Sequence, residues 1–120
     1  MKLLTIPNEI KNFSREMIKS RDGTTVMEIE KNTEYSLAFG ELEKGQKNKH
    51  HKMAMQEIYF IIEGKGRFRI DNHELITKKG DLIKITKNSS QQLTNIGKRK
   101  LKFFMIVNPP YDSQKEEILD

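Results

Sequence analysis

The chain contains no cysteine and no tryptophan, and its apolar stretches are short. Without cysteine there are no disulfides, no thiolate chemistry and no cysteine-ligated metal centre. No apolar run approaches the roughly 20 residues of a transmembrane helix, and the apolar stretch in residues 1–7 is too short for a signal peptide. We therefore expect a cytoplasmic protein with no membrane contact, whose 120 residues form one domain.

Positive charge, by contrast, is in excess. The chain has 22 basic and 17 acidic residues, a formal net charge of +5, and much of the excess lies in residues 44–52 and 98–102. Clustered lysines favour contact with phosphate backbones. Neither cluster, however, is interleaved with the aromatic side chains on which single-stranded bases stack. We interpret both as solvated surface and do not expect a nucleic-acid partner.

The N-terminal extension, residues 1–21, contains the one segment with a helical pattern, at residues 8–19. Asn8 is a suitable N-cap, and Asp22-Gly23 would end the helix. Four apolar residues fall on one face at helical spacing: Ile10, Phe13, Met17 and Ile18. We expect a short N-terminal helix here.

Short alternating segments separated by glycine and asparagine turns follow this extension. We expect strands at residues 26–30, 35–42, 55–62, 67–70, 74–77, 82–86, 91–95 and 101–107. Strands at this spacing indicate an all-β, antiparallel sandwich or barrel, which we place at residues 22–112. Asn108-Pro109-Pro110 ends the last strand. Residues 113–120 are expected to be a polar C-terminal tail, frayed or forming a short helix.

The most informative stretch runs from His50 to Glu63. Side chains alternate between the two faces of a strand, so counting in steps of two from Glu57 reaches Met53 and His51 in one direction and Tyr59 in the other. Glu57 is a carboxylate at the head of an apolar strand, where burial is costly unless the group is paired, hydrogen-bonded or bound to a metal. Any function assigned to this chain has to account for Glu57.

One hypothesis is a metal half-site, in which His51 and Glu57 converge inside the barrel, because imidazole and carboxylate suit divalent transition metals. The other is that His50 and His51 are loop residues and Glu57 is held by backbone hydrogen bonds. One β-bulge would exchange the faces of His50 and His51, so the sequence does not decide which of the two faces inward.

Two motifs then resemble the cupin family, specifically small single-domain cupins of the mannose-6-phosphate-isomerase-like kind. The first motif, G-x5-H-x-H-x(3,4)-E-x6-G, is matched by Gly45, His51, Glu57 and Gly64. The second, G-x5-P-x-G-x2-H-x3-N, is matched in spacing by Gly80, Thr86, Asn88, Gln91 and Asn95. The resemblance implies an RmlC-like jelly-roll barrel.

The resemblance also implies a metal site that has lost ligands. Metal-binding cupins use two histidines and a glutamate from the first motif and a histidine from the second. Gln91 stands at the second-motif histidine. The second histidine of the first motif is replaced by Met53 if three residues precede the glutamate, or by Lys52 if four do, and the longer spacing makes His50 the first ligand.

The metal candidates carried over are therefore His51 or His50, together with Glu57 and Gln91, and it stays open whether Lys52 enters the site. The implied cofactor is one divalent transition metal (iron, manganese, nickel or zinc) or none.

The function implied is that of a cupin barrel whose small-molecule pocket and degenerate metal site bind a sugar-like or carboxylate ligand. Tyr59, Phe104 and Met53 are the ligand-binding candidates. The alternative is a metal-dependent isomerase, dioxygenase or decarboxylase. Cupins of this type are commonly homodimers, so a homodimer is the expected assembly.

Overall fold

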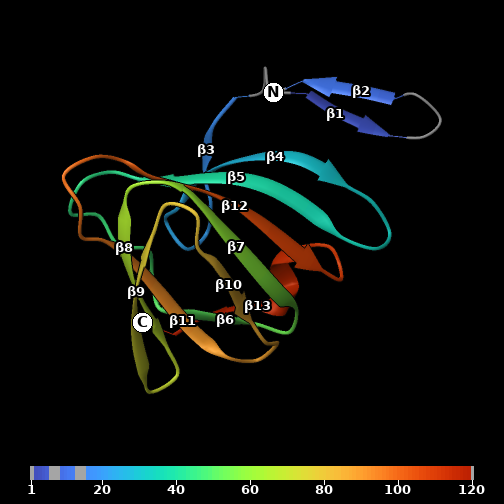
Figure 1. Cartoon of the computed structure of the whole chain (residues 1–120). Coiled ribbons are helices and arrows are strands. Elements are labelled where there is room, and N and C mark those ends of the chain that lie inside the picture. The colour runs from blue at the N-terminus through green and yellow to red at the C-terminus, as the bar shows by residue number, and fades with distance from the viewer. Residues whose placement is uncertain (1, 6–8, 13–15, 120) are drawn as a thin grey trace.

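The computed structural model describes residues 2–5, 9–12 and 16–119, and folds them into an all-β sandwich of two antiparallel sheets. Figure 1 shows the two sheets facing each other, with a separate N-terminal pair of strands, β1 (Lys2–Thr5) and β2 (Glu9–Asn12), beyond one end of the sandwich. In the described part of the chain, no helix is long and apolar enough to cross a membrane.

The larger sheet has the strand order β10-β7-β12-β5-β4-β3. Its strands are β3 (Ile18–Lys19), β4 (Thr25–Lys31), β5 (Ser36–Leu42), β7 (Gln56–Glu63), β10 (Leu82–Ile85) and β12 (Leu101–Asn108). β12 lies between β5 and β7 and pairs with both. The strand that carries Glu57, β7, is an interior strand of this sheet, paired with β10 and β12.

The smaller sheet has the order β13-β6-β11-β8-β9. Its strands are β6 (His51–Met53), β8 (Lys65–Ile70), β9 (His73–Lys78), β11 (Ser90–Asn95) and β13 (Glu116–Ile118). β6 is paired with β11 on one side and β13 on the other, with Gln91 directly opposite His51. This register places the second-motif residue beside the first-motif histidine.

The core divides the sandwich into a filled half and a hollow half. The main apolar cluster is centred on Tyr59, whose ring contacts Phe68 edge-on, at 4.9 Å between centroids, and Phe103 at 5.3 Å. A smaller cluster of Met53, Met55 and Val107 lies apart from it. Because the large aromatic rings fill the first half, the space left for a ligand is beside the second cluster.

The eight strands expected from alternation and turns are all present, with ends shifted by one or two residues. The pattern succeeded because most of these strands bury alternate residues, which fixes their register, although β9 buries only Thr77. His51, Met53, Glu57 and Tyr59 all have buried side chains, as counting by two predicts.

The prediction of a short N-terminal helix is wrong. Of residues 8–19, the structure describes 9–12 as strand β2 and 18–19 as strand β3, while residues 8 and 13–15 lie outside the described part. The helical spacing of apolar residues was outweighed by pairing of β3 with β4, where Ile18 faces Val26.

The C-terminal segment agrees with expectation only in part. It begins with a short 3₁₀ helix, Ser113–Lys115, but this leads into β13, which pairs with β6 so that Glu116 faces Met53. Residues 116–118 thus extend the smaller sheet, and the Glu116 side chain is buried rather than part of a frayed tail.

Candidate functional site

A pocket of about 430 Å³ opens in the hollow half of the sandwich. Its walls are apolar side chains from both sheets: Val26, Ala38, Met53, Met105 and Val107. Its buried titratable groups come from segments far apart in the sequence: Asp22, His51, Glu57 and Glu116. An apolar cavity with a few convergent polar groups is the usual form of a small-molecule site.

Asp22 reaches the pocket from the turn between β3 and β4. Its Oδ1 atom accepts hydrogen bonds from Ser20 Oγ at 2.7 Å and from the Thr24 backbone N–H at 2.9 Å. The sequence favours this turn because an aspartate side chain can bond the backbone two residues on. With Oδ1 committed to the turn, Oδ2 faces the pocket.

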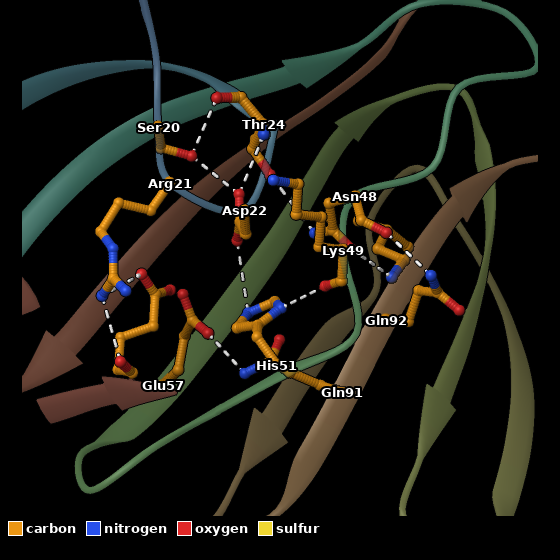
Figure 2. Close-up of polar contacts among 12 residues, drawn as sticks. Ser20, Arg21, Asp22, Thr24, Asn48, Lys49, His51, Glu57, Gln91 and Gln92 are labelled. Carbon is orange, nitrogen blue, oxygen red and sulfur yellow. Dashed lines mark hydrogen bonds and ion pairs between the residues drawn. The ribbon is translucent and has the colours of Figure 1, made fainter. Parts of the chain in front are cut away.

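His51 begins β6, and its imidazole is held from behind by the backbone. The Nδ1 atom lies 2.6 Å from the Lys49 carbonyl oxygen, which can only accept, so Nδ1 carries the hydrogen. Nε2 is then directed at Asp22 Oδ2, 3.3 Å away, as the dashed lines of Figure 2 show. A neutral imidazole would place two acceptors face to face, an arrangement that is favourable only when a proton or a metal ion lies between them.

The Lys49 backbone fixes both partners of this contact. Its N–H donates to the Asp22 carbonyl oxygen at 2.6 Å, while its own carbonyl accepts from the His51 ring. Nearby, Asn48 donates to Thr24 Oγ1 and accepts from the Leu93 backbone N–H. The aspartate turn and the histidine strand are thereby tied into one rigid unit.

Glu116 closes the site from β13. Its Oε1 atom accepts a hydrogen bond from the Tyr111 hydroxyl at 2.8 Å and lies 3.7 Å from Arg21 Nη1. The same Arg21 nitrogen donates to the backbone oxygens of Ser113 and Glu116, at 2.6 and 3.0 Å. Burial, together with the hydrogen bond to Glu116, raises the pKa of Tyr111, so this hydroxyl remains a donor.

Asp22, His51 and Glu116 form a compact group of potential ligands. One side-chain atom from each lies within 4.8 Å of the others, and all three residues are buried. A metal bound at the usual 2.0–2.2 Å separates its ligands by up to roughly 4.4 Å, so small side-chain movements fit these atoms around one ion. The backbone carbonyl on the far nitrogen of His51 is also the support that metal-binding histidines usually have.

Glu57 belongs to a second, adjoining network. Its Oε1 atom accepts from Gln91 Nε2 at 2.9 Å, and Gln91 Oε1 in turn accepts from the Tyr59 hydroxyl at 3.0 Å. Burial, and to a lesser degree the nearby charges of Asp22 and Glu116, raises the pKa of Glu57 to about 8. The carboxyl group is therefore mostly protonated at neutral pH, which explains how it is tolerated in an apolar strand.

The other residues singled out from the sequence lie in or beside the pocket, with one exception. Met53 lines the pocket, and Tyr59 and Gln91 lie behind Glu57. Phe104 is on the opposite face of β12, where its ring contacts Phe39 at 5.8 Å. The structure thus brings His51, Glu57, Gln91, Tyr59 and Met53 together but leaves Phe104 outside the pocket lining.

Two questions left open by the sequence have clear structural answers. His51, not His50, lines the pocket, since the side chain of His50 falls on the opposite phase of the strand. Lys52 does not enter the site. It points outward and pairs with Glu117 at 3.4 Å.

Sequence reasoning did not identify Asp22, Glu116 or Arg21 as site residues. Asp22-Gly23 was visible as a turn signal before a strand, but nothing local indicated that this turn folds over the barrel opening. Glu116 lies in a charged segment that reads as solvated tail. Pairing of β13 with β6, a contact between distant segments, is what buries it.

Comparison with known proteins agrees with this architecture. A family model described as a cupin domain matches residues 38–107. The uncharacterised protein MJ1618 of Methanocaldococcus jannaschii is 36% identical over 107 residues, covering 84% of this chain and 86% of that protein.

Solved structures share the fold at low sequence identity. Streptomyces Pac13 with uridine has a TM-score of 0.76 and 16% identity, covering 88% of this chain and 85% of that chain, and Pac13 is described as a nucleoside dehydratase. The polyketide cyclase RemF from Streptomyces resistomycificus has a TM-score of 0.72 and 11% identity, covering 79% of this chain and 74% of that chain. An RmlC-like protein from Shewanella frigidimarina has a TM-score of 0.74 and 13% identity, covering 84% of this chain and 89% of that chain.

Proposed function

We propose that this chain, which belongs to the cupin family, binds a small polar molecule in its pocket together with one divalent metal ion. Asp22, His51 and Glu116 would hold the ion. The observation that carries the proposal is the convergence of these three buried side chains while the His51 ring is fixed by the Lys49 carbonyl. Arg21 Nη1, 3.7 Å from Glu116 Oε1, offsets part of the cost of burying two carboxylates, and a divalent ion between Asp22 and Glu116 would offset more of it.

The donor set guides the choice of metal. One imidazole and two carboxylates suit iron(II), manganese, nickel or zinc, and the preponderance of oxygen favours the harder ions among them. Three protein ligands leave further coordination positions open, as in metal sites that also bind a substrate. When bound, such an ion polarises a ligand oxygen.

The rest of the pocket favours a ligand with several oxygen atoms, such as a sugar-like molecule or a carboxylate. The protonated carboxyl of Glu57 lines the cavity and is suited to donate a hydrogen bond. The apolar wall of Met53, Met105 and Val107 suits the carbon face of such a molecule. A volume of about 430 Å³ is within the range of small-molecule sites. Pac13, which shares the fold, is described with a bound nucleoside.

Metal binding is tested with untagged protein stripped of metal by a chelator, titrated with Mn²⁺ and Zn²⁺ in a calorimeter. E116Q removes a ligand charge inside the pocket, whereas E117Q changes the neighbouring glutamate, which is exposed and pairs with Lys52. We expect one ion per chain, an affinity at least about tenfold lower in E116Q, and no change in E117Q. Equal affinities in both variants, or no binding to the unaltered protein, would overturn the proposal.

Ligand binding is tested by thermal shift with a panel of sugars, uronic acids and hydroxycarboxylates, with and without metal. We expect stabilisation by at least one of these classes, larger in the metal-loaded protein, because ligand binding to the native state raises its stability. A panel that leaves Tm unchanged in both forms contradicts the proposed ligand class.

Enzymatic activity is the second candidate, and Glu57 favours one class over the others. A carboxyl group with a pKa near 8 beside a metal-polarised oxygen is suited to proton transfer, which fits a metal-dependent isomerase better than a dioxygenase or decarboxylase. A ligand from the panel that exchanges a carbon-bound hydrogen in D₂O, and no longer does so with E57Q, would support this candidate. The absence of exchange for every bound ligand would count against it.

A further inference from the structure

Gln91 occupies the point where the two polar networks of the pocket meet. It faces His51 directly across the β6–β11 ladder, yet its side chain bonds Glu57 and Tyr59. Figure 2 shows the Gln91 side chain beside His51, with its dashed line running to Glu57. It therefore lies within reach of the proposed metal site without contributing to it.

Both polar atoms of the Gln91 side-chain amide form hydrogen bonds. The hydroxyl of Tyr59 donates to Oε1, so this oxygen already has a partner, and Nε2 is a donor that cannot bind a cation. The Tyr59 ring is itself held by Phe68 and Phe103. The amide is thus fixed in one orientation by a rigid neighbour.

The same amide determines where the Glu57 carboxyl lies. Its Oε1 atom is 2.9 Å from Gln91 Nε2, and among the described residues Glu57 is not a member of the compact ligand group, which consists of Asp22, His51 and Glu116. Because Oε1 already accepts the Gln91 hydrogen bond, the carboxyl group is held where it lies.

We infer that Gln91 is a positioning residue that selects the metal's ligand set, holding Glu57 out of the coordination shell as a hydrogen-bonding group for the bound molecule. This inference rests on the proposed metal site. A histidine at position 91 would have the opposite effect. Its ring would face His51 across the ladder at the spacing of directly opposed strand residues, and the donor that holds Glu57 would be lost.

The first test asks whether Glu57 is a ligand. In the otherwise unaltered chain Glu57 lies outside the ligand group, so E57Q should change Mn²⁺ affinity measured by calorimetry by less than about threefold. In the Q91H background, where Glu57 is released to bind, the same substitution should lower affinity by about tenfold or more. A tenfold loss in the unaltered background, or no difference between the two backgrounds, overturns the inference.

The second test counts nitrogen ligands directly. One equivalent of Cu²⁺ is used as a spectroscopic probe in a background carrying H50Q and H73Q, which remove the two histidines other than His51. Pulsed electron paramagnetic resonance should detect one coordinated imidazole with Gln91 and two with Q91H. Two imidazoles with Gln91, or one with Q91H in protein that retains the native circular dichroism spectrum, would overturn the inference.

The two proposals fail in different ways. If neither Mn²⁺ nor Cu²⁺ binds the chain with Gln91, the proposed metal site is wrong. If the ions bind but E57Q lowers affinity as much as E116Q does, the metal site stands and the role of Gln91 is wrong.

Discussion

His51 Nε2 lies 3.3 Å from Asp22 Oδ2, although strands β4 and β5 separate the two residues in the chain. The contact is held by backbone atoms on the far side of each residue, both of them belonging to Lys49. A histidine fixed from behind and aimed at a carboxylate is preorganised to share a cation with it, at no further cost in side-chain entropy. This arrangement, together with the nearby Glu116 carboxylate, supports the proposed metal site.

The protonation of Glu57 predicts a specific dependence of stability on pH. The folded pKa is about 8 against an ordinary value of 4.5, so the folded chain keeps a proton that the unfolded chain releases. The contribution of this proton to the free energy of unfolding is fully present below pH 4.5. It falls by about 1.4 kcal/mol per pH unit up to pH 8 and does not change further above pH 8. In the presence of a chelator, the free energy of unfolding of E57Q should not show this fall. The difference between E57Q and the unaltered chain should therefore grow in favour of E57Q by about 3–5 kcal/mol from pH 4 to pH 8.

The measurement is urea unfolding at pH 4, 6 and 8. E63Q is the matched control, since Glu63 is on the same strand but half-exposed and 3.4 Å from Lys102. Parallel stability profiles for E57Q and the unaltered chain would show that Glu57 is ionised in the folded state.

Two glycines with nearly the same backbone angle should differ in their tolerance of a side chain. Gly64 has φ +95° and Gly80 has φ +94°, so alanine is strained at both. A Cβ at position 64 would lie 2.7 Å from the Lys100 carbonyl oxygen, whereas nothing lies within 4 Å at position 80. We expect G80A to cost about 1–2 kcal/mol and G64A about 3 kcal/mol or more in urea unfolding. Equal losses would mean that steric contact at position 64 is relieved by backbone movement.

Asn48 should contribute to both stability and metal affinity. Its side chain joins Thr24, next to the Asp22-Gly23 turn, to the Leu93 backbone. N48A leaves a buried N–H of β11 without its acceptor, which we expect to cost about 2–3 kcal/mol and to lower Mn²⁺ affinity by loosening the ligand positions. N72A, in an exposed turn, is the control and should change unfolding by less than about 0.5 kcal/mol. A stable N48A variant with unchanged metal affinity would contradict this role.

The homodimer expected from the sequence would use the outer face of the larger sheet. There Leu82 faces Phe60, Phe60 faces Phe104, and Phe104 faces Phe39, forming an apolar row across four strands. Leu82 is 63% and Phe60 43% exposed, which is unusual for adjacent large apolar side chains on a monomer. We predict a dimer by light scattering after size exclusion, dissociated by F60K. I76K, an exposed apolar position on the other sheet, should leave the dimer intact, and a monomeric unaltered chain would refute the prediction.

Alternation and turn chemistry were sufficient to locate eight strands of the sandwich, but not β3, β6 or β13. The two-residue period of a strand predicts the buried phase from His51 through Glu57 to Tyr59, but the structure was needed to show that His51 rather than His50 lines the pocket. The unusual status of Glu57 also follows from the sequence, because a carboxylate in an apolar strand demands either a partner or a proton. The spacing of glycines and asparagines carried the family resemblance.

Only the tertiary structure decided which side chains complete the site. Asp22 and Glu116 reach the pocket because the β3–β4 turn and strand β13 fold against β6, and such contacts between distant segments leave no local periodicity. The helix expected near the N-terminus was wrong for a similar reason, since pairing of Ile18 with Val26 outweighs local spacing. Gln91 looked like a lost ligand in the sequence. In the folded chain it is the donor that holds Glu57, because its partners Tyr59 and Glu57 are brought to it by a neighbouring sheet.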